Sequence, residues 1–217
     1  MRNTLRITVL GATGAAGSRI VTEALDRGHE VTAVTRDAAR FADLDPRARH
    51  RTGNALDAGS LAELAAGQDL LISATRPVPG QEEQLADTAR ALLAGLAGTG
   101  VRLLLLGGAG SLRLPGSDTL TVVDGPGFPP SWRPIALACN AQLDVCRTSG
   151  ADVDWAYVSP AADFAPGPRT GAYRLGTDEL LVGADGTSAI SMEDMALALL
   201  DEAERPKHHR TRFTVGY

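Results

Sequence analysis

The stretch "ITVLGATGAAGSRIVTEALDRGHEVTAVTRDAAR", residues 7–40, carries the strongest structural signal in this chain. It begins with a short apolar run and passes through three glycines spaced three apart, Gly11, Gly14 and Gly17. Apolar residues at helical spacing follow, and then a second short apolar run. We predict a strand at 5–10, a helix at 15–27 and a strand at 30–35, which together form one β-α-β unit.

The three glycines stand where the predicted helix begins. At such a turn, glycine permits positive φ, lets the backbone approach a pyrophosphate, and lets the helix pack close to the strand. Free N–H groups at the helix start would face the anion. The spacing is G-x-x-G-x-x-G rather than the commoner G-x-G-x-x-G. We therefore predict a nucleotide site here, with a turn used only for packing as the alternative.

Length and composition set the fold class. A chain of 217 residues suits one domain, and its 4% aromatic content favours helices packed on an aliphatic parallel sheet. Strand and helix patterns alternate along the chain. We predict an α/β fold: a three-layer, Rossmann-like, doubly wound parallel sheet with a small C-terminal substrate-side section. A single NAD(P)-binding domain would span 1–217, with substrate-side loops at 111–133 and 160–190.

The remaining elements follow from the same patterns. Short helices are expected from Asp37 and at 60–66, and longer ones at 81–96 and 134–149. Ser191 should open the last helix. The glycine-punctuated segment 170–186 is typical of a hairpin. Further strands are expected near 47–52, from Asp69, at 101–108, from Val153 and at 211–215.

Several classes of protein are disfavoured. The net charge of −5, with scattered arginines, gives no footprint for nucleic acid. No run of 18 apolar residues and no signal segment occurs, so we expect a cytoplasmic protein without a membrane partner. Cys139 and Cys146, seven residues apart on one predicted helix, are too far apart for a disulfide. No His, Cys and carboxylate cluster has metal-ligand spacing.

The end of the second strand indicates which cofactor is preferred. NAD-selective sites place a carboxylate there, whereas a 2′-phosphate calls for a guanidinium. This chain has Arg36 there and Arg40 four residues later, so both could reach one phosphate if the stretch is helical. Asp37 would then cap the short helix. We predict NADP(H) as cofactor with NAD(H) as the alternative, unless both arginines are ordinary solvated side chains.

Seven stretches resemble a known family: "GATGAAG", "GHEVTAVTRDAAR", "GNALD", "LLGGAGSL", "DWAYVSPAADFAPGPRTGAYRLG", "GTSAISMEDMALALLDE" and "HHRTRFTVGY". The chain is similar to the atypical short-chain dehydrogenases with an NmrA-like NAD(P)H-binding domain, in particular the YwnB-like NADH-flavin reductases. More distantly it resembles mammalian flavin reductase, also called biliverdin-IXβ reductase. The resemblance covers nearly the whole chain.

The resemblance implies roles for residues after each strand. The turn residues Gly11, Thr13, Gly14, Ala15 and Gly17 would line the pyrophosphate, Arg36 and Arg40 the 2′-phosphate, and Asn54 and Ala55 the adenine. Ser73, Ala74 and Thr75 would lie under the ribose on the nicotinamide side. Gly108, Ala109, Gly110, Ser159, Pro160 and Ala161 would frame the nicotinamide.

The chemistry departs from that of ordinary short-chain dehydrogenases. Those enzymes use a Tyr with a Lys four residues later, and the helix from Pro134 contains neither. Flavin reduction needs no such pair. Ser111 is the candidate catalytic hydrogen-bond donor, or else a turn serine. Phe128 and Trp132 would stack on a planar acceptor or else cover the core. Tyr173 is a candidate for the substrate wall by family position. Tyr157 is expected in the core, and His208 and His209 are expected on the surface.

We therefore expect an NADPH-dependent reductase of a flavin or another planar conjugated acceptor such as a quinone, with flavin as substrate rather than prosthetic group. One alternative is a reductase or isomerase that tailors a specialised metabolite. Another is a cofactor-sensing regulator without turnover. The protein is expected to act as a monomer or homodimer, since the helix at 134–149 could form a dimer face or simply cover the sheet.

Overall fold

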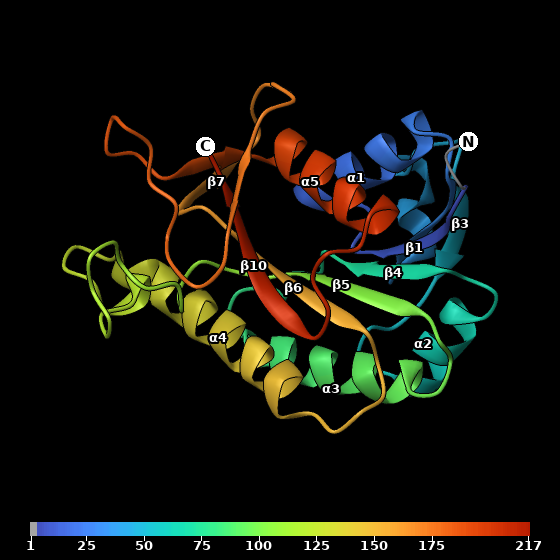
Figure 1. The fold of residues 1–217 in the computed structure, drawn as a ribbon. Coiled ribbons are helices and arrows are strands. Elements are labelled where there is room, and N and C mark those ends of the chain that lie inside the picture. Colours follow the sequence, from blue (N-terminus) through green and yellow to red (C-terminus); the bar gives the residue numbers. More distant parts are fainter. Residues whose placement is uncertain (1–3) are drawn as a thin grey trace.

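A mixed sheet forms the centre of the computed structural model, which describes residues 4–217. Over this range the sheet has eight strands in the order β3-β2-β1-β4-β5-β6-β10-β8 (Figure 1). All neighbouring strands are parallel except β8, which runs antiparallel to β10 at the edge. The strands are β1 Arg6–Leu10, β2 Glu30–Thr35, β3 Arg49–Thr52, β4 Leu70–Ser73, β5 Arg102–Leu106, β6 Trp155–Pro160, β8 Arg174–Gly176 and β10 Thr211–Gly216.

Helices cover both faces of this sheet. Figure 1 shows α1 and α5 on one face and α2, α3 and α4 on the other. A separate two-stranded sheet pairs β7, Asp163–Ala165, with β9, Ala189–Ser191. The predicted three-layer, doubly wound architecture is confirmed. The helices are α1 Ala15–Asp26, α2 Ala58–Ala65, α3 Gln84–Leu96, α4 Arg133–Thr148 and α5 Met192–Glu204.

Two hydrophobic cores lie on the two faces. Ile72 of β4 and Leu104 of β5 pack with α1 and α5, whereas Leu71 and Leu103, one residue earlier on each strand, pack on the opposite face. Successive strand side chains point to opposite faces, so central strands need an unbroken apolar run. The four consecutive leucines at 103–106 of β5 meet this requirement.

Local capping follows the sequence closely. Ser191 Oγ accepts a hydrogen bond from the Asp194 backbone N–H at 3.0 Å, which confirms the predicted cap of α5. Asp37 Oδ1 accepts from the Ala39 N–H at 2.9 Å and opens a short 3₁₀ helix, Ala38–Asp43. The predicted helix after Asp37 is therefore present in its tighter form.

The hairpin predicted over 170–186 is wrong. Its strand, β8, pairs with β10 instead, with Leu175 opposite Val215. Two glycines of this segment, Gly171 and Gly186, have positive φ of 79° and 82°. β10 borders β6 on one side only, so its other edge offers free backbone groups that β8 satisfies.

The strand order favours a ligand-binding crevice at the carboxyl ends of β1 and β4. The chain runs outward from β1 to β2 and β3 in one direction and from β4 to β6 in the other. Helices that leave β1 and β4 therefore cross to opposite faces of the sheet, and a crevice opens at the carboxyl ends of these two strands. The glycine turn follows β1 at this point.

Candidate functional site

The turn between β1 and α1 needs its glycines for space. Gly11 has φ +76°, and a Cβ there would lie 2.5 Å from the carbonyl oxygen of Ala74. A Cβ on Gly17 would lie 2.1 Å from the carbonyl oxygen of Gly11. Gly14 is the N-cap of α1 and provides no side-chain cap, and the first turn contains no acidic residue. The start of α1 is therefore suited to receive an anion.

A cavity of about 280 Å³ opens beside this turn at the switch between β1 and β4. Its size is near the lower end of small-molecule pockets. Residues that follow β1, β2, β3 and β4 contribute to its wall, together with the start of α3. Of the predicted cofactor residues, the structure brings together Gly11, Thr13, Gly14, Arg36, Arg40, Asn54, Ala55, Ala74 and Thr75 along this cavity.

The two predicted phosphate arginines differ in their surroundings. Arg40 donates from Nε to Asp43 at 2.9 Å, so part of its guanidinium is already engaged. Arg36 is exposed and makes no hydrogen bond or ion pair with any residue in the described part of the chain. Asp37 is tied to its own helix start. Within residues 4–217, Arg36 therefore presents an unpaired guanidinium to the pocket wall.

Sequence reasoning missed a third guanidinium, Arg76. It lines the same cavity, directly after Thr75 and beyond the carboxyl end of β4. Its position next to the switch-point strand was a usable signal, because ligands bind outside the carboxyl ends of such strands. The far wall comes from α3 residues that carry no motif, Gln84, Leu85 and Thr88.

Comparison with known proteins agrees with this geometry. Residues 11–206 match the model of a family described as NAD(P)H-binding. The chain belongs to this NAD(P)H-binding family. It is 39% identical over 214 residues to the uncharacterized protein YwnB of Bacillus subtilis, an alignment that covers 97% of this chain and 98% of YwnB.

Two solved structures extend the comparison. One from Streptococcus pneumoniae, provisionally named an NADH-flavin reductase, superposes with a TM-score of 0.85 at 32% identity, covering 98% of this chain and 99% of that one. Another from Bacteroides thetaiotaomicron, provisionally named an epimerase, has a TM-score of 0.88 at 36% identity, covering 99% and 98%. The fold is therefore that of the NAD(P)H-binding family, and the relatives' names point to more than one chemistry.

In this NAD(P)H-binding fold, the segment after β5 lies against α4. A Cβ on Gly108 would lie 3.0 Å from the Cys139 side chain, and one on Gly110 would lie 3.0 Å from Asn140 Oδ1. Burial raises the pKa of Cys139 to about 11, and the charge of Arg76 acts in the opposite direction. Arg76, which lines the cavity, is therefore near enough to Cys139 for its charge to act on that thiol.

The segment at the end of β6 that is predicted to frame the nicotinamide lies within the core. Ser159, Pro160 and Ala161 are all buried, and Ser159 is fully so. The Ser159 hydroxyl has no hydrogen-bond partner among the described residues. Ser73 is also buried and shares a hydrogen bond with the Thr75 hydroxyl at 3.2 Å. These residues do not line the cavity, and neither do Ala15, Gly17, Ala109 and the glycines after β5.

The three predicted acceptor-side residues near α4 also lie outside the cavity. Ser111 is partly exposed, and its Oγ accepts a hydrogen bond from Arg212 Nη1 at 2.7 Å. Trp132 is 57% exposed, so it does not cover the core, and Phe128 is half-buried. Both aromatic residues precede α4 in the loop expected at 111–133.

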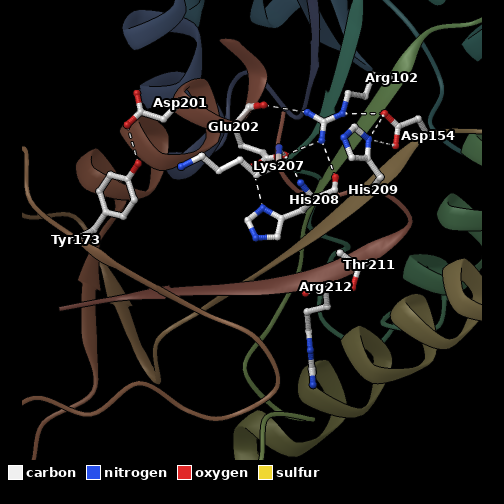
Figure 2. Close-up of polar contacts among 10 residues, drawn as sticks. All are labelled: Arg102, Asp154, Tyr173, Asp201, Glu202, Lys207, His208, His209, Thr211 and Arg212. Carbon is white, nitrogen blue, oxygen red and sulfur yellow. Dashed lines mark hydrogen bonds and ion pairs between the residues drawn. The ribbon is translucent and has the colours of Figure 1, made fainter. Parts of the chain in front are cut away.

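The hydroxyls of all three tyrosines of the chain donate hydrogen bonds to groups outside the cavity. Tyr157 is fully buried, as expected, and donates to the Cys139 carbonyl at 2.9 Å. Burial raises the pKa of Tyr157. Tyr217 donates to Asp194 at 2.7 Å. Tyr173 donates to Asp201 of α5 at 2.6 Å, away from the cavity, so the structure does not bring this predicted substrate-wall residue to the pocket (Figure 2).

The chain's only lysine, Lys207, and the two histidines that follow it lie just before the amino end of β10. His208 is half-buried, hydrogen-bonded to Glu202 at 2.8 Å and stacked on Phe213, so its predicted surface position is wrong. His209 is exposed as expected.

Within residues 4–217 no cluster could hold a metal ion, and no helix has the length and apolar character that crossing a bilayer requires. Both cysteines are free thiols.

Proposed function

We propose that this protein is an NAD(P)H-dependent oxidoreductase that prefers NADPH and reduces a flavin or another planar conjugated acceptor such as a quinone. The observation that carries the proposal is the switch-point cavity, where a glycine turn and the free guanidinium of Arg36 share one wall. A pyrophosphate and a 2′-phosphate are the two anions that these groups suit.

The residues of the cavity fit the adenosine half of the cofactor. The start of α1 would hold the pyrophosphate, and Asn54 with Ala55 would contact the adenine. Arg36 would bind the 2′-phosphate as a planar fork, with Arg40 and Arg76 adding positive charge. The preference for NADPH over NADH is supported by Asp37, since one of its carboxylate oxygens already accepts a hydrogen bond from the Ala39 N–H.

The acceptor side rests on position and orientation. A bound NADPH supplies the hydride. The chain's residues would hold the acceptor parallel to the nicotinamide, with Trp132 and Phe128 stacking on its plane and Ser111 donating a hydrogen bond to it. The remaining proton of a reduced flavin comes from water, so no acid of this chain is needed. We leave Tyr173 out of the proposed site because its hydroxyl is bound to Asp201.

The lack of a Tyr–Lys pair supports a flavin or quinone over a ketone. Each tyrosine hydroxyl already has another partner, and Lys207 lies beyond the end of α5, next to β10. The provisional name of the Streptococcus pneumoniae neighbour points to the same class. The same lack is what keeps the alternative of a cofactor-sensing NmrA-like regulator open.

The test is an anaerobic assay of NADPH oxidation at 340 nm, with FMN, riboflavin and a quinone supplied in turn at saturating cofactor. Loss of absorbance that depends on the acceptor is the expected result. Tight NADPH binding without oxidation by any acceptor would overturn the reductase and favour the sensor. Oxidation by none of these, but by a carbonyl compound or specialised metabolite, would favour the tailoring enzyme.

A further inference from the structure

The guanidinium of Arg212 is buried and contacts the Ser111 hydroxyl. The Arg212 side chain is 3% exposed and extends from β10 toward α4, on the face opposite to the charged cluster around Glu202 (Figure 2). Its Nη1 donates to Ser111 Oγ at 2.7 Å, and its Nε donates to Asp178 Oδ1 at 2.9 Å. Nη2 also donates to Asp178. Burying a charged side chain is unfavourable unless its hydrogen bonds are made, so this contact is a specific one.

The backbone around Ser111 is held on both sides. The Arg113 N–H donates to the Asp178 carbonyl at 2.8 Å, and the Leu180 N–H donates to the Arg113 carbonyl at 2.9 Å. The Val123 N–H donates to the Gly110 carbonyl at 3.0 Å. With the main chain fixed, the torsion of the Ser111 hydroxyl is the freedom that remains.

The hydrogen bond from Arg212 restricts how the Ser111 hydroxyl can be oriented. A guanidinium has donors and no acceptor, so Ser111 must accept from Arg212 and its own hydrogen must point elsewhere. Among residues 4–217 no acceptor takes this hydrogen. An adjacent positive charge also polarises the hydroxyl, which makes it a stronger donor.

We propose that Arg212 is a positioning residue: it holds Ser111 as an oriented, polarised hydrogen-bond donor toward the acceptor of the hydride. The inference rests on the proposed reductase function and deepens it. Electron density arrives on the acceptor ring as it is reduced, and a preoriented donor stabilises that change without rearranging. Arg212 itself touches neither acceptor nor cofactor.

The test is a double-mutant cycle of Arg212→Gln and Ser111→Ala, read as single-turnover NADPH oxidation by FMN. We expect each single variant to slow hydride transfer about ten-fold, and the double variant to be no slower than either, because Arg212 acts through Ser111. NADPH affinity should stay within about twofold of the wild type in all three. The matched control is Arg147→Gln, the second guanidinium on Asp178, which should leave the rate unchanged.

Rates that multiply in the double variant, or an equal loss of NADPH binding, would assign Arg212 a purely structural role. If Arg212→Gln fails to fold, Arg212→Lys replaces it, since an ammonium cannot hold Ser111 and Asp178 with a fork geometry. A wild-type protein that reduces no acceptor overturns the reductase and this inference together. An active wild type with multiplying losses overturns this inference alone.

Discussion

Two arginines lie at opposite ends of the parallel strands, which we call the carboxyl edge and the amino edge of the sheet, and they differ in their surroundings. At the carboxyl edge, Arg36 is exposed and unpartnered within the described chain. At the amino edge, Arg102 is 11% exposed and lies between carboxylates of Asp154 and Glu202 (Figure 2). Arg102 donates to Glu202 twice, at 2.6 and 2.9 Å, and to the His208 carbonyl at 2.7 Å. The donors of Arg102 are satisfied within the fold, whereas those of Arg36 are available to the proposed cofactor.

Arg102→Met is expected to give the largest effect. It leaves the buried Glu202 carboxylate without its main partner, and breaking such a pair lowers the free energy of unfolding by about 3–5 kcal/mol. Urea denaturation at pH 7 measures this. Arg90→Gln is the matched control, because its ion pair with Asp87 is exposed and should contribute less than about 1 kcal/mol. Equal losses in the two variants would remove the distinction between the edges.

Arg36→Glu should act on binding and leave stability nearly unchanged. Losing a charge-assisted contact to the 2′-phosphate corresponds to roughly 10- to 100-fold weaker NADPH binding, with a far smaller change for NADH. Isothermal titration at fixed salt measures both. The control is Arg49→Glu, an exposed arginine on β3 that does not line the cavity. Equal losses for NADPH and NADH would contradict the assignment of Arg36 to the 2′-phosphate.

Glu202 should give the smallest effect, as a pH dependence of stability. Burial opposes its ionisation, but hydrogen bonds from Arg102 and His208 outweigh burial and lower the pKa of Glu202 below its usual 4.5. A carboxyl with a lowered pKa stabilises the fold above the unfolded-state value, and this contribution is lost as pH falls through the folded-state value.

Unfolding free energies from pH 7 down to pH 3 therefore should fall less steeply for Glu202→Gln than for the wild type. Glu63→Gln, an exposed position on α2, is expected to follow the wild-type curve. Parallel curves for wild type and Glu202→Gln would show that this carboxyl does not set the acid sensitivity.

Local patterns predict much of the fold. The β1-α1-β2 unit, the cap at Ser191 and the long helices follow from apolar spacing and short-range hydrogen bonds, which are written in neighbouring residues. The lining of the proposed cofactor pocket is predictable from local patterns, because many of its residues follow the carboxyl ends of strands.

Contacts between distant segments account for what the sequence could not show. Arg169 binds Glu23 at 2.9 Å across 146 residues, Tyr173 reaches Asp201 on α5, and β8 pairs with β10 rather than within its own segment. No local spacing encodes these partners. They draw the stretch around 169–173 over α1 and α5, away from the pocket that family position suggested for Tyr173.

The measurement that tests the central claim most directly is the binding of NADPH and NADH to the wild-type protein, titrated side by side at one salt concentration. A free guanidinium in the cavity wall predicts that NADPH binds at least about ten-fold more tightly than NADH. Equal affinities would contradict the role of Arg36. Failure of both cofactors to bind would contradict the assignment of the switch-point cavity itself.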